Sequence, residues 1–298
     1  MVPGRNCGKS DMSSITADSF KTGFLPTWCP GCGDFGIWMA LKQALAQLGI
    51  GPDDAAIVYG IGCHGNMYDW MNTYAVEGLH GRALPVAQGV KLANHKLPVI
   101  VVSGDGDCLG EGGNHFIHAA KRNPDITVII HDNQVYGLTT GQASPTAQQG
   151  FKTKSTPEGV TDEPVNPLTL AITAGATFVA RGFAADSPGL TQLFVDAISH
   201  KGFAVVDTLQ PCVTFDRVHT YAWYRERLYQ LKQEGYRADN RLGALEKALE
   251  WGDRIPLGIF YQETRLTSED REPALTGEPL VSASAGTVQA DELLKEFI

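Results

Sequence analysis

The sequence predicts an α/β fold in which helices flank a mostly parallel, twisted sheet. One observation is that short runs rich in β-branched residues, such as Val99–Ser103, have no helical periodicity, which is typical of strands buried on both faces. The other is that these runs alternate with helical segments and end in glycine or polar residues. Parallel strands place such ends at one carboxyl edge, where ligands of open α/β sheets bind.

The elements are expected in a regular order. A Pro- and Gly-rich turn at 26–33 precedes a helix over 35–48, which Asp34 can cap and Gly49 can end. The other expected elements are a strand over 55–59, a helix over 85–94, a strand over 99–103, a helix over 111–122, a strand over 126–130, a helix over 167–174, a strand over 177–181, a helix over 189–200 and a last core strand over 203–209.

The domain organisation is expected to be simple. Residues 1–20 are polar and irregular and predict a flexible N-terminus. One domain is expected over 21–263, with 138–166 as a long ordered loop over the site and 219–250 helical in character. Residues 264–298 turn polar and predict a C-terminal tail that wraps the domain.

Composition excludes several classes of partner. The chain has 298 residues, 43% hydrophobic and 19% charged, which is ordinary for a globular protein with a sizeable core. A net charge of −9 argues against nucleic acid and against an anionic membrane surface. The sequence contains neither a membrane-spanning apolar stretch nor a signal-like N-terminus, so a cytoplasmic location is expected.

Polar residues follow two neighbouring expected strands. Asp105 lies in the sequence GDGD after the strand over 99–103, and Asn133 follows the next strand. Their oxygens suit a hard cation such as Mg²⁺ that also holds phosphate oxygens. Gly104 and Gly106 let the backbone approach a phosphate, and the helix after them directs free N–H groups to the same place. The arrangement predicts a diphosphate-bearing cofactor with Mg²⁺; the alternative is two ordinary strand-end turns.

Four of the six cysteines fall in Pro- or Gly-rich turns, namely Cys29, Cys32, Cys63 and Cys212. Their thiolates could bind zinc or a cubane iron–sulfur cluster, and one close pair with two distant singles favours the cluster. The alternative is a thioredoxin-like pair with two buried thiols. Cys108 is expected to serve packing, and Cys7 to be incidental.

The path from GDG to Asn133 resembles the thiamine diphosphate motif, in which the Asp, the Asn and the carbonyl two residues past the Asn hold the metal. Carried over, these are Asp105, Asn133 and the backbone of Val135. Other segments extend the likeness, in chain order: TWCPGCGDFG (27–36), GIGC (60–63), MNTY (71–74), HGRA (80–83), GVKLAN (89–94), VSGDGD (102–107), GGNH (112–115), DNQVYGLTTGQASPT (132–146) and the Pro-Cys at 211–212. Together they resemble the β subunit of the two-subunit 2-oxoacid:ferredoxin oxidoreductases, and most closely its 2-oxoglutarate branch.

This resemblance implies a single thiamine-diphosphate-binding domain with Mg²⁺ and one [4Fe–4S] cluster, held by Cys29, Cys32, Cys63 and Cys212. It implies a partner α subunit that supplies the aminopyrimidine half of the site and the activating glutamate, in an (αβ)₂ heterotetramer. The implied reaction is coenzyme A-dependent oxidative decarboxylation of a 2-oxoacid, or its reversal, with electrons passing through the cluster to ferredoxin.

Further site residues follow from the resemblance. Those expected against the cofactor are Gly62, Gly104, Gly106 and Asp107. His80 and Arg82 are expected to line the site as catalytic residues, with a structural ion-pair corner as the alternative. The remaining candidates, His64, His115, His118 and His131, are expected to be helix-face, loop or core histidines.

Two positions depart from the family pattern. Many members have a basic residue at the position of Asn66 and a lysine at that of Thr140. Both positions are associated with the substrate's carboxylates, so we expect Asn66, Leu138 and Thr140 to form the pocket wall. The distal carboxylate of 2-oxoglutarate would then need Arg82, Lys91 or the α subunit.

Other functions stay open on the sequence alone. Preference for pyruvate, or a broad 2-oxoacid specificity, is the alternative within the family. A non-catalytic iron–sulfur electron-transfer subunit is an alternative of another class, which intact Asp105 and Asn133 disfavour. A third is a non-oxidative thiamine decarboxylase with zinc in the cysteine site.

Overall fold

An eight-stranded sheet forms the centre of the protein. The computed structural model describes residues 15–282 and 294–295, and its sheet has the order β2-β1-β3-β4-β8-β7-β10-β9. The strands are β1 (Ala56–Tyr59), β2 (Tyr74–Glu77), β3 (Val99–Gly104), β4 (Ile126–Asp132), β7 (Phe178–Phe183), β8 (Phe203–Leu209), β9 (Leu228–Gln230) and β10 (Ile255–Gln262). From β2 to β7 all neighbours are parallel, whereas β10 is antiparallel to β7 and parallel to β9. The expected α/β class with a mostly parallel sheet is confirmed.

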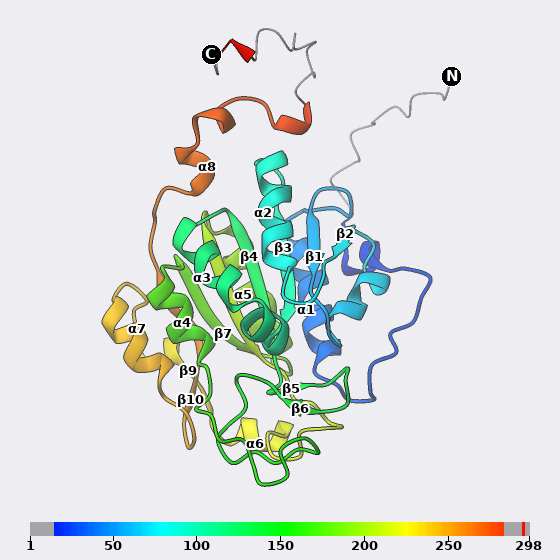
Figure 1. The fold of residues 1–298 in the computed structure, drawn as a ribbon, viewed down its shortest axis with the longest axis vertical. Coiled ribbons are helices and arrows are strands. Elements are labelled where there is room, and N and C mark those ends of the chain that lie inside the picture. The colour runs from blue at the N-terminus through cyan, green and yellow to red at the C-terminus, as the bar shows by residue number, and fades with distance from the viewer. Residues whose placement is uncertain (1–14, 283–293, 296–298) are drawn as a thin grey trace.

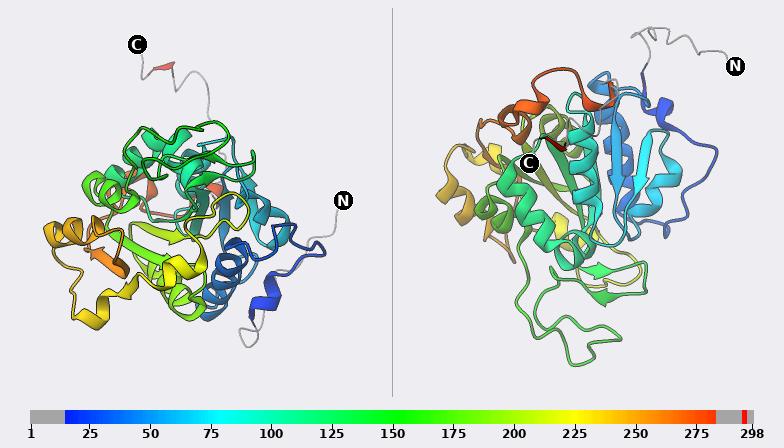
Figure 2. Two further views of the ribbon diagram at one scale, coloured as in Figure 1. Left: turned by 90° about the horizontal axis from the view of Figure 1, so that it is seen from below. Right: turned by 45° about the horizontal axis from the view of Figure 1, so that its top comes forward.

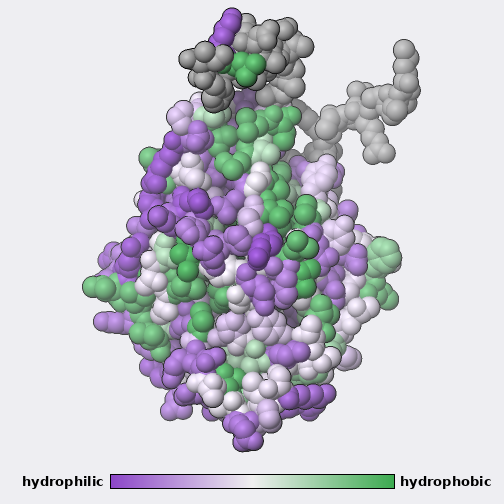
Figure 3. All heavy atoms as spheres, in the orientation of Figure 1, coloured by the Kyte–Doolittle hydropathy of each residue, from purple (hydrophilic) through white to green (hydrophobic). Residues whose placement is uncertain are grey.

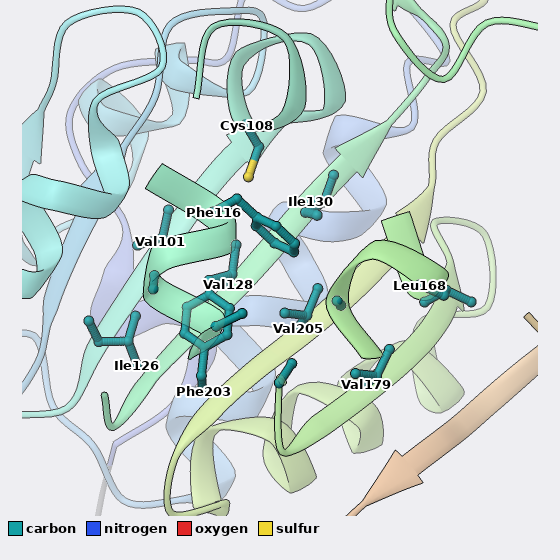
Figure 4. Packing of buried hydrophobic residues seen from close by; sticks show 14 of the residues in the cluster. Val101, Cys108, Phe116, Ile126, Val128, Ile130, Leu168, Val179, Phe203 and Val205 are labelled. Atoms are coloured by element: carbon teal, nitrogen blue, oxygen red, sulfur yellow. The ribbon is translucent and has the colours of Figure 1, made fainter. Parts of the chain in front are cut away.

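Helices cover both faces of this sheet (Figures 1 and 2). One face packs against α1 (Asp34–Gln47) and α5 (Ser187–Ser199). The other packs against α2 (Ala83–Ala93), α3 (Gly113–Arg122), α4 (Pro167–Ala174) and α7 (Arg241–Ala248). In the second layer, Phe116 of α3 meets Phe203 of β8 edge to face, with ring centroids 5.9 Å apart (Figure 4). Burial of each such side chain contributes about 1.5–3 kcal/mol to the free energy of folding.

The strand register brings the predicted polar residues to one edge. Gly104 of β3 pairs with His131 of β4, and Asp132 of β4 pairs with Leu209 of β8. The residues that follow these three parallel strands therefore lie side by side. The short hairpin of β5 (Val135–Tyr136) and β6 (Gln142–Ala143) lies at this edge, below the sheet in Figure 1.

Helical structure starts earlier after β3 than expected. A π-helical turn spans Gly106–Glu111 directly after Asp105, and α3 follows from Gly113. π-helical turns are rare and frequent at functional sites. Asp34 is also not the cap of α1, because Gly33 occupies that position and the Asp34 carboxylate contacts Cys32 and His131 instead.

Three strands of the eight-stranded sheet, and both strands of the β5–β6 hairpin, were absent from the sequence-based expectation. The strand over 203–209 is not the last of the core, because β10 follows it and pairs with β7. The segment 219–250 is not continuously helical: it contains α6 (Tyr221–Arg225), β9, a 3₁₀ turn at Leu231–Glu234 and α7. At the other edge, β2 pairs with β1.

The chain after β10 returns along the amino edge of the sheet. It forms α8 (Ser268–Arg271) and two short 3₁₀ turns, Pro273–Leu275 and Leu280–Ser282. Ser268 N–H donates to the carbonyl of Asn123 at the end of α3 (3.1 Å), and Leu275 is buried. Of the N-terminus over 1–20 that was expected to be flexible, residues 1–14, with Cys7, lie outside the described residues, as does most of 283–298. Its last residues form the 3₁₀ turn Ala17–Phe20, in which Phe20 is fully buried.

Candidate active site

A cavity of about 70 Å³ opens at the carboxyl edge of β1, β3 and β4. All seven predicted cofactor residues line it, namely Gly62, Gly104, Asp105, Gly106, Asp107, Asn133 and Val135, together with His80, Leu138 and Cys63. Ile61, His64, Tyr136, Gly137 and Thr139 complete the wall. A larger hollow of about 510 Å³ between α5, β7 and β10 contains none of the predicted site residues, so it is not the candidate site.

Asp105 lies at the centre of this site and is almost fully buried. Three donors converge on its Oδ2: the hydroxyls of Ser144 and Thr146, and the backbone N–H of Gln134 at 3.1 Å. Burial raises the pKa of Asp105, and the two hydroxyls oppose that rise. Because the donors gather on one oxygen, the other can face a cation.

Thr146 connects Asp105 to a second buried acid. Its hydroxyl oxygen lies 2.8 Å from Oδ1 of Asp132 as well as beside Asp105, but a hydroxyl has only one proton to donate. Burial and the negative charges of Asp207 and Asp105 raise the pKa of Asp132 well above its ordinary value. The hydroxyl of Thr146 thus bridges the two carboxyl groups, and burial beside two negative charges favours the neutral form of Asp132.

Both carboxylate oxygens of Asp107 form hydrogen bonds with other groups of the protein. Its Oδ1 accepts from the N–H groups of Ile61 (3.1 Å) and Gly81 (2.7 Å) and lies 2.6 Å from Nδ1 of His80, while its Oδ2 accepts from Ser103 (2.6 Å). Asp107 thus ties two turns to the end of β3 and orients His80. With Nδ1 bonded to Asp107, the Nε2 atom of His80 lies 3.7 Å from Glu111.

Asn133 is held in a fixed orientation. Its Oδ1 accepts from the N–H of Val135 (3.0 Å), and its Nδ2 donates to Oε1 of Gln210 (3.1 Å). An amide oxygen has two lone pairs, so Oδ1 keeps one for a metal. Asp105, Asn133 and the Val135 carbonyl therefore offer the oxygen donors that Mg²⁺ prefers.

The glycines of the motif provide space beside these ligands. A Cβ on Gly104 would lie 2.8 Å from the His64 ring, and one on Gly106 would lie 2.4 Å from the Tyr136 ring. The N–H of Gly104 donates to Nε2 of His64 (3.0 Å), so that nitrogen carries no proton. Burial first, and the nearby His131, lower the pKa of His64 to about 4, which keeps its ring neutral.

The turns that carry the four predicted cysteines are joined to one another beside this cavity, which Cys63 lines. The Trp28 indole donates to the Cys63 carbonyl (2.7 Å), and the Gly33 N–H donates to the Pro211 carbonyl (3.3 Å), so the three cysteine-bearing turns are joined. Burial raises the pKa of Cys63 to about 12, with Asp34, Cys212 and Cys29 adding to the rise. Burial likewise raises the pKa of Cys32 and of Cys212.

Burial favours the neutral thiols, so a metal centre would have to supply the positive charge that stabilises them as thiolates. Within the part of the chain that the structure describes, no group of three or more His, Cys, Asp and Glu side chains is arranged to hold a metal ion. Cys108 is buried in the core near Phe116, apart from the four, as its expected packing role requires (Figure 4).

The predicted substrate residues are only partly brought together. Leu138 lines the cavity, but Asn66, in the 3₁₀ turn Gly65–Trp70, and the exposed Thr140 do not. Arg82 donates to the carbonyls of His80 (3.2 Å) and Glu111 (2.9 Å). The prediction for Lys91 is wrong: it is buried, paired with Asp125 at 2.8 Å at the opposite edge of the sheet, and unavailable to a substrate.

Several site residues were missed from the sequence. Ser144 and Thr146 hold Asp105 from a loop about 40 positions away, Gln210 holds Asn133, and Tyr136 stands over Gly106. The sequence SPT after the motif was visible as part of the family resemblance, but nothing in it indicated contact with Asp105. Gln210 next to Cys212 carried no signal of its own.

Comparison with known proteins first defines the class. A family model described as "Thiamine pyrophosphate enzyme, C-terminal TPP binding domain" matches residues 60–208, which contain the whole cavity wall. A second family model, for the C-terminal part of the β subunit of pyruvate ferredoxin oxidoreductase, matches residues 212–276. The fold and site are thus those of a thiamine diphosphate-binding domain.

Relatives then narrow the class to a family. The β subunit of 2-oxoacid:ferredoxin oxidoreductase from Saccharolobus solfataricus is 44% identical, over 90% of this chain and 95% of the relative. The 2-oxoglutarate synthase subunit KorB from Archaeoglobus fulgidus is 40% identical, over 85% of this chain and 91% of the relative. The chain belongs to the β subunits of 2-oxoacid:ferredoxin oxidoreductases, as the sequence motifs had predicted.

A solved structure agrees with this family. The 2-oxoglutarate:ferredoxin oxidoreductase from Magnetococcus marinus, with 2-oxoglutarate, coenzyme A and succinyl-CoA bound, has a TM-score of 0.88 and 33% identity. The match covers 96% of this chain and 97% of that one. A β subunit implies an α subunit as its partner. None of the helices in the described residues could span a membrane.

Proposed function

We propose that this chain, together with an α subunit, catalyses coenzyme A-dependent oxidative decarboxylation of 2-oxoglutarate, or the reverse carboxylation, with ferredoxin as the electron partner. The observation that carries the proposal is that buried Asp105 and oriented Asn133 lie at the same edge as four cysteine thiols. This proximity supports diphosphate binding and electron transfer within one site.

The residues have distinct tasks in this mechanism. Asp105, Asn133 and the Val135 carbonyl would hold Mg²⁺, and the Gly104–Gly106 backbone leaves room for the diphosphate. Bound there, thiamine diphosphate would supply the carbanion chemistry that makes decarboxylation of a 2-oxoacid possible. His80 lines the cavity and is oriented by Asp107, so it is the group to which we assign proton transfer.

The four cysteine thiols suit the electron-transfer step of the reaction. Cys29, Cys32, Cys63 and Cys212 would ligate a [4Fe–4S] cluster beside the cavity, through which electrons leave one at a time. The joining of their turns beside the cavity supports one shared centre for the four thiols. An adjacent cluster shortens the electron path from the cofactor, which supports ferredoxin as the acceptor.

The surface is consistent with a large protein partner. Large hydrophobic side chains are exposed on the loop after Phe20 and near the cavity side of β2, with Phe24 70%, Leu25 85% and Leu79 80% exposed. Figure 3 shows hydrophobic residues in patches between polar ones on one face, including a protrusion at the right where this loop lies in Figure 1. These patches support an interface with the α subunit and, by the family pattern, an (αβ)₂ assembly.

The substrate is the least constrained part of the proposal. A dicarboxylate needs a second cationic partner, because an unpaired carboxylate in a closed pocket carries a large desolvation cost. Lys91 cannot serve, and Asn66 and Thr140 carry no charge. We therefore assign the distal carboxylate to Arg82 or to the α subunit, and 2-oxoglutarate rests on the KorB relatives and the Magnetococcus marinus structure.

The test is an assay of the anaerobically purified αβ complex with 2-oxoglutarate, pyruvate and 2-oxobutyrate, coenzyme A and a one-electron acceptor. We expect the highest kcat/KM for 2-oxoglutarate and no activity of the isolated chain. If pyruvate is preferred tenfold, about 1.4 kcal/mol in transition-state stabilisation, the substrate proposal fails.

The site assignment has its own test. Asp105→Ala should abolish Mg²⁺-dependent binding of thiamine diphosphate, because the metal then loses its anionic ligand. Cys212→Ala should lose the cluster's visible absorbance and acid-labile sulfide, while Cys108→Ala should retain both. Unchanged cofactor occupancy in Asp105→Ala, or stoichiometric zinc without sulfide in the unaltered protein, contradicts the assignment.

A further inference from the structure

Gln210 connects the two halves of the proposed site. It follows β8 and is 2% exposed, and its backbone N–H donates to the Asp132 carbonyl (2.8 Å). Its side-chain Oε1 accepts from Nδ2 of Asn133 (3.1 Å), and its Nε2 donates to Sγ of Cys32 (3.3 Å). One buried amide therefore touches a proposed Mg²⁺ ligand and a proposed cluster ligand.

The orientation of this amide is fixed by its partners. Asn133 must present Nδ2 to Gln210, because its Oδ1 accepts from the Val135 N–H. Gln210 must then present its oxygen to Asn133 and its NH₂ group to the sulfur of Cys32. A reversed amide would place two NH₂ groups together and a carbonyl oxygen against the sulfur. The backbone of Gly33 packs closely against the Gln210 side chain, because a Cβ on Gly33 would lie 2.6 Å from Cγ of Gln210. The side chain therefore has little room to change its conformation.

Each end of the amide has a physical consequence. An N–H donor to a cluster sulfur stabilises the more negative, reduced state and so raises the reduction potential. An acceptor on Nδ2 of Asn133 keeps its Oδ1 turned toward the metal, as partners behind metal ligands generally do. We infer that Gln210 is a positioning residue that tunes the cluster potential and orients the Mg²⁺ ligand Asn133 at the same time. This inference rests on the proposed function.

Two substitutions separate the two roles. Gln210→Met has similar volume and removes both hydrogen bonds. Gln210→Glu, when ionised, still accepts from Asn133 but cannot donate to Cys32. The matched control is Gln43→Met on α1, where Gln43 accepts from the Thr191 hydroxyl (3.0 Å) and contacts neither proposed centre.

The experiment uses the anaerobic αβ complex at pH 8 and two readouts apart from turnover. The cluster potential is measured by redox titration with electron paramagnetic resonance, and Mg²⁺ affinity by titrating the metal against thiamine diphosphate binding. Gln210→Met should lower the potential and weaken Mg²⁺ by about tenfold or more. Gln210→Glu should lower the potential with Mg²⁺ affinity within about threefold of the unaltered complex.

The outcomes distinguish the inference from the proposal beneath it. If Gln210→Met matches Gln43→Met in both potential and Mg²⁺ affinity, Gln210 is only a packing residue and the inference is overturned. If Gln210→Glu weakens Mg²⁺ as much as Gln210→Met, the assigned role of Oε1 is wrong. If the unaltered complex has neither cluster nor thiamine diphosphate, the proposed function itself fails.

Discussion

Asp107 shows how a residue of a cofactor motif can serve the fold. Its carboxylate accepts from Ser103, Ile61, Gly81 and His80. Asp107→Ala leaves these donors without partners, and each unsatisfied buried donor costs about 1–3 kcal/mol. We expect the free energy of unfolding of the isolated chain to fall by about 3 kcal/mol or more in urea denaturation.

The matched control for this prediction is Asp239→Ala. Asp239 pairs only with Arg237 on the surface, where ion pairs contribute little. The unfolding midpoint of the Asp239→Ala variant should equal that of the unaltered chain. An equally small effect for Asp107→Ala would mean that the two turns are held by other contacts.

Among the residues that the structure describes, Lys42 is a buried cation without an anionic partner in direct contact. Its side chain is 1% exposed and its Nζ lies 3.1 Å from the centre of the Trp38 ring. Burial first, then Lys21, lower its pKa to about 8, while Asp18 opposes this shift. Between pH 8 and its ordinary pKa, the unfolded chain therefore binds more protons than the folded one.

Stability should consequently rise with pH through that window. We expect the free energy of unfolding to increase by about 1–3 kcal/mol from pH 7 to pH 9.5, relative to Lys42→Met, which has no such group to titrate. Urea denaturation of both proteins at the two pH values measures the difference. Parallel pH profiles would show that the Trp38 ring fully compensates for burial.

Single residues explain which parts of the site were predictable. Asp105 and Asn133 end strands whose apolar runs are visible in the sequence, and parallel pairing brings strand ends together. Ser144, Thr146 and Gln210 were not predictable as partners, because their contacts depend on loop paths that no periodicity records. Lys91 was misassigned because a sequence does not show that Asp125 already neutralises it.

At the level of elements, the central strands were predictable and the outer ones were not. β3, β4 and β8 are buried throughout and rich in β-branched residues. β2 is largely exposed, and its four residues, YAVE, are too few to show a strand periodicity. β10 contains Pro256 and Gly258, which normally argue against a strand; Pro256 pairs with Tyr229 of β9 and Gly258 with Arg181 of β7.

The packing of α1 depends on Gly36. A Cβ there would lie 2.0 Å from the carbonyl oxygen of Ala184, in the turn after β7. The backbone of Ala184 cannot move aside as a flexible side chain can. Gly36→Ala must therefore displace α1, the helix that directly follows the turn with Cys29 and Cys32. We expect a loss of about 2 kcal/mol or more in the free energy of unfolding.

A second helical glycine provides the control. Gly89 in α2 has nothing within 4 Å of its would-be Cβ. Gly89→Ala should stabilise the chain by about 0.5–1 kcal/mol through helix propensity alone. If both variants shift stability in the same direction, the close approach of α1 to Ala184 is not what constrains position 36.

At the scale of the whole molecule, two core layers on opposite faces of one sheet depend on turns at its amino edge. Asn123 ends α3 in the left-handed conformation, with φ of 59°. Its Oδ1 accepts from Phe203 N–H (2.8 Å) and from the Thr177 hydroxyl (2.8 Å), and its Nδ2 donates to the Leu266 carbonyl (3.2 Å). One side chain thus joins α3, β8, β7 and the segment after β10.

Replacing Asn123 with glycine tests this junction without backbone strain, because glycine adopts the left-handed conformation freely. The buried Thr177 hydroxyl and Phe203 N–H and the part-buried Leu266 carbonyl lose their hydrogen bonds, so Asn123→Gly should lower the free energy of unfolding by about 2–4 kcal/mol. Proteolysis under native conditions should also cut 263–272 sooner, since Leu266 loses its anchor. Asn94→Gly after α2, where the amide contacts only the Lys96 N–H (3.3 Å), is the control. Lower stability with unchanged cleavage of 263–272 would mean that the C-terminal segment is held instead by Glu269, whose carboxylate accepts from the Asp125 N–H independently of Asn123.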